Sequence, residues 1–206
     1  MNRKFFLLPQ EKQERILRAG WRVFSQNSYK KSPMGEVAAE AGISKSLLFH
    51  YFVNKKEFYI FLWDRCAQIT MQYLEKFSCY EQEDLFEAMY RGMQAKLRLM
   101  TEEPELSLFA VKAFYEKEEE IRLAIKESYQ KYFHTKADKA LRHVDVGRFI
   151  PGLDLQMMYR EMYWASEGYL WEMLQHGGLD VKQMEEDFIK LLDFWKSVYL
   201  VPSVGD

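Results

Sequence analysis

Three polar side chains within six residues have the chemistry to bind a polar, anionic partner. Lys45, Ser46 and His50 supply a cation, a hydroxyl and an imidazole, and a further cation, Lys55, follows shortly after. Phosphate oxygens accept hydrogen bonds from groups of these kinds. The residues that we expect to point outward from this stretch are Lys45, Ser46, Leu47, Phe49, His50 and Tyr51.

Two short predicted helices position these side chains. Residues 36–41 are alanine-rich and favour a helix, Gly42 allows a tight turn, and Ser44 is typical of the cap of a second helix over residues 45–52. This arrangement predicts a helix-turn-helix, whose second helix enters the DNA major groove. Helix pairs joined by glycine also occur in proteins that bind no DNA, so the bare pattern leaves both interpretations open.

The charge distribution favours DNA binding. The whole chain of 206 residues carries a net charge of only −2. Residues 1–56, however, contain 11 Lys/Arg and 4 Asp/Glu, a net charge of +7, and the remaining 150 residues carry −9. A basic N-terminal segment on an acidic body favours docking of that segment on phosphates, although charge asymmetry also arises by chance.

The stretch AGISKSLLFHYFVNKKEF resembles the DNA-binding motif of the TetR family of bacterial transcription regulators. In that family an Ala-Gly-Val/Ile-Ser turn leads into a Lys-Gly-x-Leu-Tyr-x-His/Tyr-Phe helix, and a lysine opens the next helix. The resemblance covers most of the first 60 residues, including LPQEKQERILRAGWRVF. Beyond them only the length and the all-helical pattern agree.

The resemblance implies DNA contacts at eight positions. Lys45 matches a position that meets bases or phosphates, Leu47 matches a variable base-reading position, and Lys55 matches a phosphate clamp at a helix start. These eight positions are Ser44, Lys45, Ser46, Leu47, Phe49, His50, Tyr51 and Lys55.

Two positions depart from the family pattern. Ser46 stands where the family often has glycine, and Phe49 stands where it has tyrosine, so Phe49 cannot donate a hydrogen bond to phosphate. Phe49 is as consistent with core packing as with DNA contact. His50 and Tyr51 match groove and phosphate contacts, with an ordinary surface histidine as the alternative for His50.

The remaining pattern predicts an all-α fold of nine helices without strands. We expect a helix-turn-helix DNA-binding domain over residues 1–53 and a helical ligand-binding and dimerisation domain over residues 54–206. A long helix from residue 55 to residue 77 would link the two domains. The last two helices are expected at about 154–176 and 180–200.

These last two helices carry more apolar surface than one subunit is expected to cover, which predicts a homodimer held by a four-helix bundle. The alternative is that their apolar residues pack only inside one subunit. The residues expected in the dimer interface are Met158, Trp164, Trp171, Phe188, Leu191 and Trp195.

The resemblance also implies a ligand pocket in the helical body. Methionine and aromatic side chains suit an adaptable apolar cavity, although such stripes are more often ordinary core. Glu167 would pair with a cationic ligand or else face solvent. The candidate lining residues are Trp63, Met89, Met93, Phe109, Tyr129, Met162, Tyr163 and Glu167.

Several functional classes are disfavoured. The sequence has no glycine-rich phosphate loop and no His/Cys/Asp/Glu set at metal-ligand spacing, so we expect no enzyme, no cofactor and no metal site. No apolar run approaches the ~18 residues that span a bilayer. Two cysteines, Cys66 and Cys79, are expected on one helix and unpaired, which favours the reduced cytoplasm.

These observations predict a cytoplasmic, homodimeric transcription regulator of the TetR type. We expect a repressor that leaves a palindromic double-stranded DNA operator when a small-molecule effector binds the C-terminal domain, with no membrane partner. The alternative is a helical protein-protein adaptor that does not bind DNA.

Overall fold

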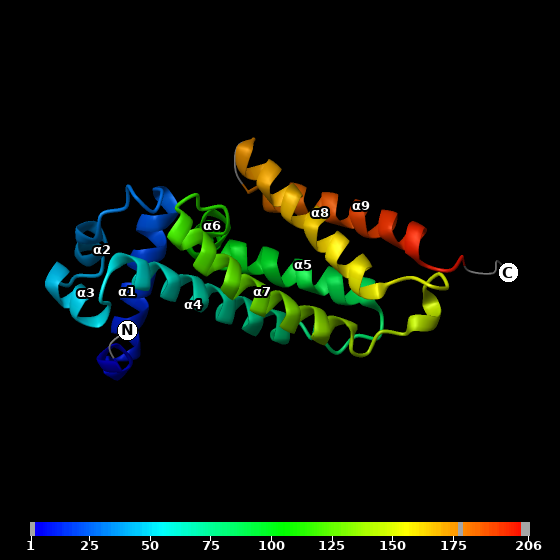
Figure 1. Cartoon of the computed structure of the whole chain (residues 1–206), viewed down its shortest axis with the longest axis horizontal. Coiled ribbons are helices and arrows are strands. Elements are labelled where there is room, and N and C mark those ends of the chain that lie inside the picture. The colour runs from blue at the N-terminus through cyan, green and yellow to red at the C-terminus, as the bar shows by residue number, and fades with distance from the viewer. Residues whose placement is uncertain (1–2, 177–178, 203–206) are drawn as a thin grey trace. The chain divides into compact units, whose positions relative to one another are not determined.

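The computed structural model describes residues 3–176 and 179–202, and within these ranges the chain is helical, without a strand. The predicted all-α fold of nine helices is confirmed for this part of the chain (Figure 1). In chain order the elements are the 3-10 segment η1 (Arg3–Leu7), α1 (Gln10–Gln26), α2 (Met34–Glu40), α3 (Lys45–Tyr51), α4 (Lys55–Lys76), α5 (Leu85–Glu102), α6 (Pro104–Phe114), α7 (Glu119–Leu141), the 3-10 segment η2 (Val146–Arg148), α8 (Leu155–Gln175) and α9 (Val181–Tyr199).

Polar caps fix where most of these helices begin. The side chain of Ser44 accepts a hydrogen bond from the backbone N–H of the third residue of α3, and Asn54 does the same for α4. Asp84, Asp154 and Asp180 cap α5, α8 and α9 in the same way. Each cap satisfies a backbone donor that has no partner inside the helix, so these boundaries are encoded locally.

The chain divides by packing into two compact units, and the first comprises Met1–Ile69 and Glu102–Tyr132. In it α1 packs against both α2 and α6. An aromatic cluster fills the space between these helices and the first turns of α4, with ring centroids 4.9–6.5 Å apart in the pairs that involve Phe24. Its members are Phe24, Tyr29, Phe58, Tyr59 and Phe109.

One glycine of α1 allows α4 to approach closely. A Cβ atom added to Gly20 would lie 2.7 Å from the side chains of both Leu62 and Phe58, which are themselves fully buried. A side chain at this position would therefore force the buried side chains of Leu62 and Phe58 to shift. This close packing of α1 on α4 stabilises the unit that contains the helix-turn-helix.

The second unit comprises Thr70–Thr101 and Phe133–Asp206. Its core is formed by α5, α8 and α9, and Figure 1 shows α8 and α9 running side by side. Backbone hydrogen bonds tie the η2 segment to the end of α9, from Ile150 N–H to Tyr199 O at 3.0 Å and from Val201 N–H to Arg148 O at 2.9 Å. The buried residues of this core are Leu85, Phe86, Ala140, Val144, Phe149, Met158, Met162, Leu192 and Trp195.

This division by packing does not coincide with the functional division expected after residue 53. Both α4 and α7 contribute residues to each unit. The first unit extends beyond the helix-turn-helix because α6 packs on α1 and the first part of α7 contacts α4, as in the hydrogen bond from Trp63 to Ser128.

Candidate DNA-binding face and ligand cavity

The turn between α2 and α3 has the geometry of a helix-turn-helix. Gly42 adopts a φ of 64°, a left-handed conformation that side chains disfavour, and nothing lies within 4 Å of a Cβ placed there. The turn therefore requires glycine for its backbone and not for space. The Ser44 hydroxyl accepts a 3.1 Å hydrogen bond from the N–H of Leu47, which starts α3 immediately after the turn.

One face of α3 is exposed, as expected for a recognition helix. Lys45, Ser46, Phe49 and His50 are exposed, and Leu47 is half-buried. The opposite face is held by Leu48 and by Phe52 after the helix, both fully buried. The exposed set combines a cation, a hydroxyl, an imidazole and a phenyl ring, which match the donors and apolar groups that contact phosphates and base edges.

Tyr51 does not point outward, so this part of the sequence prediction is wrong. The residue is only 6% exposed, and its ring meets the Phe5 ring edge-on with centroids 6.1 Å apart. Phe5 also packs against Phe52 and Phe61, at centroid distances of 5.1 and 5.4 Å. The η1 segment thus covers the end of α3, and an isolated helix pattern carries no signal for that contact.

Lys55, the expected phosphate clamp, is turned toward the loop between α1 and α2. Its Nζ donates a 3.3 Å hydrogen bond to the Lys30 carbonyl and lies 4.8 Å from the centroid of the Tyr29 ring. Burial lowers the pKa of Lys55, and the carboxylate of Glu116 partly offsets that effect. In this conformation Lys55 fastens the loop to the start of α4.

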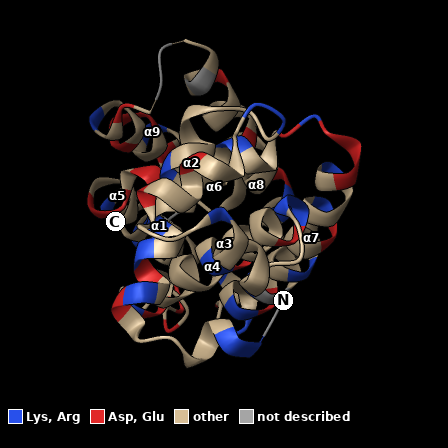
Figure 2. Ribbon diagram, turned by 90° about the vertical axis from the view of Figure 1, so that its left-hand side faces the viewer, with Lys and Arg blue, Asp and Glu red and all other residues tan. Residues whose placement is uncertain are grey.

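Basic residues flank α3 on the surface of the first unit. Figure 2 shows Lys and Arg segments on α1 and near the N-terminus around the short α3 ribbon. Arg22 is exposed and forms a 3.3 Å ion pair with Glu40, whereas Lys31 is exposed in the loop before α2. These cations give the face an electrostatic attraction for phosphates.

Residues 116–120 (Glu-Lys-Glu-Glu-Glu) form a mostly acidic run. The run includes the start of α7 at Glu119, and three of its carboxylates also contact the basic segment at the N-terminal end. Sequence spacing gave no sign of these contacts, because the partners lie 64 to 88 residues apart. They are Tyr29 N–H to Glu116 at 3.0 Å, Lys30 to Glu118 at 2.8 Å and Lys56 to Glu120 at 3.4 Å.

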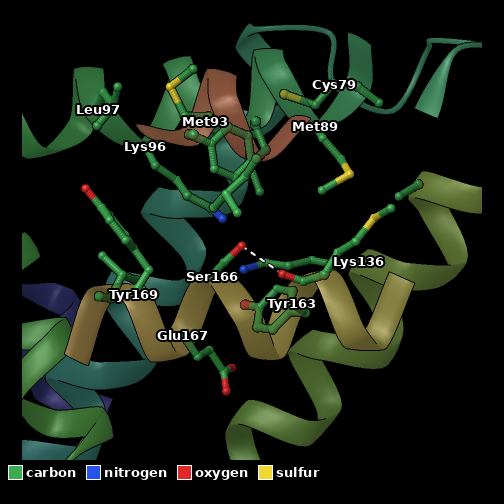
Figure 3. Close-up of a pocket in the computed structure, with 18 of the residues that line it drawn as sticks. Cys79, Met89, Met93, Lys96, Leu97, Lys136, Tyr163, Ser166, Glu167 and Tyr169 are labelled. Atoms are coloured by element: carbon green, nitrogen blue, oxygen red, sulfur yellow. Dashed lines mark hydrogen bonds between the residues drawn. The ribbon is translucent and has the colours of Figure 1, made fainter. Parts of the chain in front are cut away.

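A cavity of about 160 Å³ lies within the second unit, between α5, α7, α8 and α9 (Figure 3). Its volume is similar to that of engineered apolar cavities that bind benzene. Most of its wall is apolar, including Leu97, Leu170 and Phe188. Five of the predicted lining residues do line it, namely Met89, Met93, Met162, Tyr163 and Glu167.

The other three predicted lining residues lie in the first unit and do not line this cavity. Trp63 donates a 3.1 Å hydrogen bond to the Ser128 hydroxyl, Phe109 packs on Tyr59, and Tyr129 packs on Phe114. Each is therefore part of ordinary packing in that unit. Their sequence pattern is the same as that of cavity residues, since both kinds of site use aromatic side chains at helical spacing.

The cavity contains ionisable groups with shifted pKa values. Burial raises the pKa of the Glu167 carboxyl to about 7, and the positive charge of Lys96 partly opposes that shift. Burial lowers the pKa of Lys136, with a further lowering from the charge of Lys96 and an opposing effect from Tyr163. The Lys96 ammonium lies 5.8 Å from the centroid of the Tyr163 ring.

Some residues expected in a dimer interface are buried inside the chain. Met158 and Trp195 are 3% and 1% exposed in the core of the second unit, and Phe188 and Leu191 pack against that core. These regularly spaced apolar residues of α9 therefore pack inside their own subunit. This is the alternative to a dimer interface that the sequence left open.

A second stripe on α8 remains exposed. Met157, Trp164 and Trp171, which follow one another at intervals of seven residues, are 51%, 58% and 40% exposed. On α9, Phe194 and Val198 are 60% and 43% exposed. Large exposed apolar side chains arranged in this way are typical of a surface that binds another protein.

Residues 3–176 and 179–202 contain neither a cluster of metal ligands nor a helix that could span a membrane. No group of three or more His, Cys, Asp or Glu side chains is placed to hold a metal ion there. In the same ranges no helix combines the length and the apolar character needed to cross a membrane.

An all-helical fold with a glycine turn, a capped and exposed second helix and flanking cations defines a helix-turn-helix DNA-binding protein. The family pattern described as "Bacterial regulatory proteins, tetR family" matches residues 16–60. Residues 16–60 therefore match the TetR family, and the chain as a whole is similar to transcriptional regulators with a helix-turn-helix.

Individual relatives agree with this assignment. The HTH-type transcriptional regulator AcrR of Shigella flexneri is 21% identical over 205 residues, which cover 93% of this chain and 92% of that protein. The fold is similar to that of SmeT, the repressor of the Stenotrophomonas maltophilia multidrug efflux pump SmeDEF, with a TM-score of 0.72, 19% identity and 96% coverage of each chain. It is also similar to that of Bacillus subtilis FadR in complex with stearoyl-CoA, with a TM-score of 0.64, 19% identity and coverage of 87% of this chain and 96% of that one.

Proposed function

We propose that this regulator is a cytoplasmic repressor that binds a palindromic operator as a homodimer and leaves it when a small molecule occupies the cavity of the second unit. Residues 1–53 would act as the DNA-binding domain, and residues 54–206 would bind the ligand and dimerise. The observation that carries this proposal is the polar face of α3, where Lys45, Ser46 and His50 are exposed.

The DNA contacts follow from the position of that face. Lys45 and Ser46 occupy the first turn of α3, where the N-terminal residues of a recognition helix contact base edges. Leu47 would pack on a thymine methyl group, and His50 would reach the groove or a phosphate. In the bound state Lys55 would leave the Lys30 carbonyl and the Tyr29 ring for a phosphate, which its flexible four-carbon stem permits.

Homodimer formation is supported by the exposed stripe of α8. A single helix-turn-helix makes few contacts, and specific binding at ~10⁻⁸ M or tighter requires two of them about one helical turn apart. Met157, Trp164 and Trp171 on α8, with Phe194 and Val198 on α9, offer the apolar area for such pairing. Two helices from each subunit would then form a four-helix bundle.

Release by a small molecule is supported by the apolar cavity. SmeT is named as the repressor of a multidrug efflux pump, and Bacillus subtilis FadR was crystallised with stearoyl-CoA. Both proteins share this fold. A ligand that fits the cavity better in the DNA-free conformation would shift the population away from the operator-bound state.

A gel shift with the duplex DNA upstream of the protein's own gene tests this function. We expect saturable binding that survives an excess of unrelated duplex, and we expect Lys45→Ala to change which operator variants are preferred. The alternative function, a helical adaptor, predicts no duplex binding even at low salt. That result would overturn the proposal.

A further inference from the structure

Two lysines converge in the cavity of the second unit. Lys96 enters from α5 and Lys136 from α7, and Figure 3 shows their amino groups directed toward each other across the cavity. The charge of Lys96 is close enough to lower the pKa of Lys136. Two cations are thus held within electrostatic reach in a site whose wall is mostly apolar.

Neither lysine forms a hydrogen bond or an ion pair with a carboxylate among the described residues. Lys96 is exposed at the edge of the cavity and lies over the face of the Tyr163 ring, whereas Lys136 is half-buried. Removing a cation such as that of Lys136 from water is costly unless an anion compensates it. Other lysines of the same unit are compensated, as Lys139 by Glu75 at 3.3 Å and Lys190 by Asp187 at 2.8 Å.

Glu167 is an acidic residue of the same cavity, but it does not act as the anion that compensates the two lysines. Glu167 lines the cavity, but in Figure 3 its side chain extends from α8 on the side away from the two amino groups. Burial raises its pKa to about 7, so near neutral pH it carries only part of a negative charge. The net charge of the ionisable side chains lining the cavity is therefore positive.

The remaining residues of the cavity wall are suited to bind the apolar part of a ligand. Met89, Met93 and Met162 supply unbranched, polarisable side chains, and Tyr80 and Tyr159 supply rings. Methionine and aromatic side chains adapt to hydrocarbon or ring systems of various shapes. A ligand that satisfies both features has an apolar body and one anionic head.

We infer that the effector is an amphipathic carboxylate whose head is bound between Lys96 and Lys136 and whose apolar body lies against the methionines of α5 and α8. This inference rests on the proposed function and specifies its ligand class. A cationic amphiphile, which Glu167 alone would favour, places its head beside two lysines and is repelled. A neutral ligand with the same apolar body leaves the half-buried Lys136 without a compensating anion.

The test uses three probes with the same chain and different heads, namely octanoate, 1-octanol and octylamine. Isothermal titration calorimetry on the full-length protein measures their affinities. We expect octanoate to bind about 10- to 100-fold more tightly than 1-octanol, the range for hydrogen bonds to charged groups, and octylamine to bind most weakly.

Variants identify the groups responsible. Lys136→Met should lower octanoate affinity by about 10-fold or more while leaving 1-octanol affinity within about twofold, and Lys96→Met should act in the same direction. Lys136→Arg keeps the charge and should retain most of the preference for octanoate. The matched control is Lys126→Met, which removes an exposed lysine of α7 outside the cavity. Thermal unfolding of each variant verifies that it folds.

The possible outcomes separate this inference from the proposed function. Three results would each overturn the inference: octylamine binding as tightly as octanoate, no octanoate binding at millimolar concentration, or an unchanged octanoate affinity in Lys136→Met. In each of these cases operator binding in the gel shift would remain intact, so the proposed function would stand. Loss of the proposed function would appear instead as failure to bind duplex DNA, with the octanoate preference still present in calorimetry.

Discussion

The backbone N–H of Tyr29, in the loop before α2, donates a 3.0 Å hydrogen bond to the carboxylate of Glu116, 87 residues further along the chain. Within the same acidic run, Glu118 pairs with Lys30 and Glu120 pairs with Lys56. These carboxylates hold the helix-turn-helix region in place, and they also neutralise lysines that would otherwise attract phosphates. Stability and DNA affinity therefore oppose each other at this contact.

Neutralising the two outer carboxylates should strengthen binding to DNA. In the double variant Glu118→Gln/Glu120→Gln we expect a several-fold higher affinity for any duplex at low salt, because Lys30 and Lys56 lose their competing anions. The gain should disappear at high salt, where exposed charges are screened. Fluorescence anisotropy with a labelled duplex measures both conditions.

The double variant Glu81→Gln/Glu83→Gln is the control, since it removes the same charge from exposed positions of the second unit. An equal gain in that variant would mean that only total charge matters. The specific contacts at residues 116–120 would then have no role in DNA affinity.

Lys55 should contribute one phosphate contact in the bound state. Lys55→Met is expected to weaken binding to all sequences and to reduce the slope of log K against log salt by about one. Tyr29→Leu removes the ring beneath the ammonium but keeps the charge, so it should leave the slope unchanged. If Lys55→Met also left the slope unchanged, Lys55 would serve only to fasten the loop.

Any side chain at Gly20 should destabilise the fold. The Cβ of Gly20→Ala would lie 2.7 Å from buried atoms of Leu62 and Phe58, and relieving such overpacking costs about 1–3 kcal/mol. Urea denaturation measures the loss in the free energy of unfolding. Gly35→Ala, at an exposed position of α2 with nothing within 4 Å of the new atom, should have an effect of at most about 1 kcal/mol, and in the stabilising direction. Equal destabilisation by both substitutions would contradict the packing argument.

Glu167 should make stability depend on pH. Its pKa is about 7 in the folded chain and 4.5 ordinarily, so the folded state holds more protons between these values. The free energy of unfolding therefore falls as pH rises from about 4.5 to about 7, and the loss is complete above that window. Because the residue is half-buried, solvent screening limits the effect to about 1–2 kcal/mol.

Glu167→Gln removes the titrating group and should flatten this part of the profile. The variant should be more stable than the parent protein above neutral pH and close to it near pH 4. Urea denaturation across this range compares the two. A parent and a variant with parallel profiles would show that the carboxyl group titrates normally.

The exposed tryptophans of α8 should control dimerisation. Trp164→Asp/Trp171→Asp is expected to raise the dimer dissociation constant by about 100-fold or more, because large aromatic residues dominate such interfaces. Sedimentation velocity measures the assembly state, and operator affinity should fall in parallel. The control Leu123→Asp alters an exposed apolar residue of α7 in the first unit and should leave the dimer intact.

The helices were predictable from the sequence because their signals are local. Ser44, Asn54 and Asp154 cap helices within three residues of themselves, and Gly42 sets the turn by its own φ. The exposed side of α3 followed from the same local pattern, except at Tyr51. That residue is buried by Phe5, 46 residues earlier, and no periodicity within α3 reports such a contact.

The residues that line the cavity and those that form the exposed apolar stripe of α8 were predicted only in part, since the spacing of apolar residues does not say what they pack against. Trp63 and Met93 have the same pattern in the sequence, yet Trp63 packs in the first unit and Met93 lines the cavity. On α9, Trp195 continues a regular apolar seam but is buried in its own subunit. The pairing of Lys96 with Lys136 joins residues 40 positions apart on different helices, and only the tertiary structure reveals it.

The docking of Phe5 on Tyr51 and Phe52 has a practical consequence for producing the protein. A coding sequence that starts at Met34, or a recombinant version trimmed to Pro9, would lack the ring that seals the end of the recognition helix. An affinity tag placed before η1 would lie close to α3, because η1 contacts that helix. A C-terminal tag is therefore the safer choice for any assay of operator affinity.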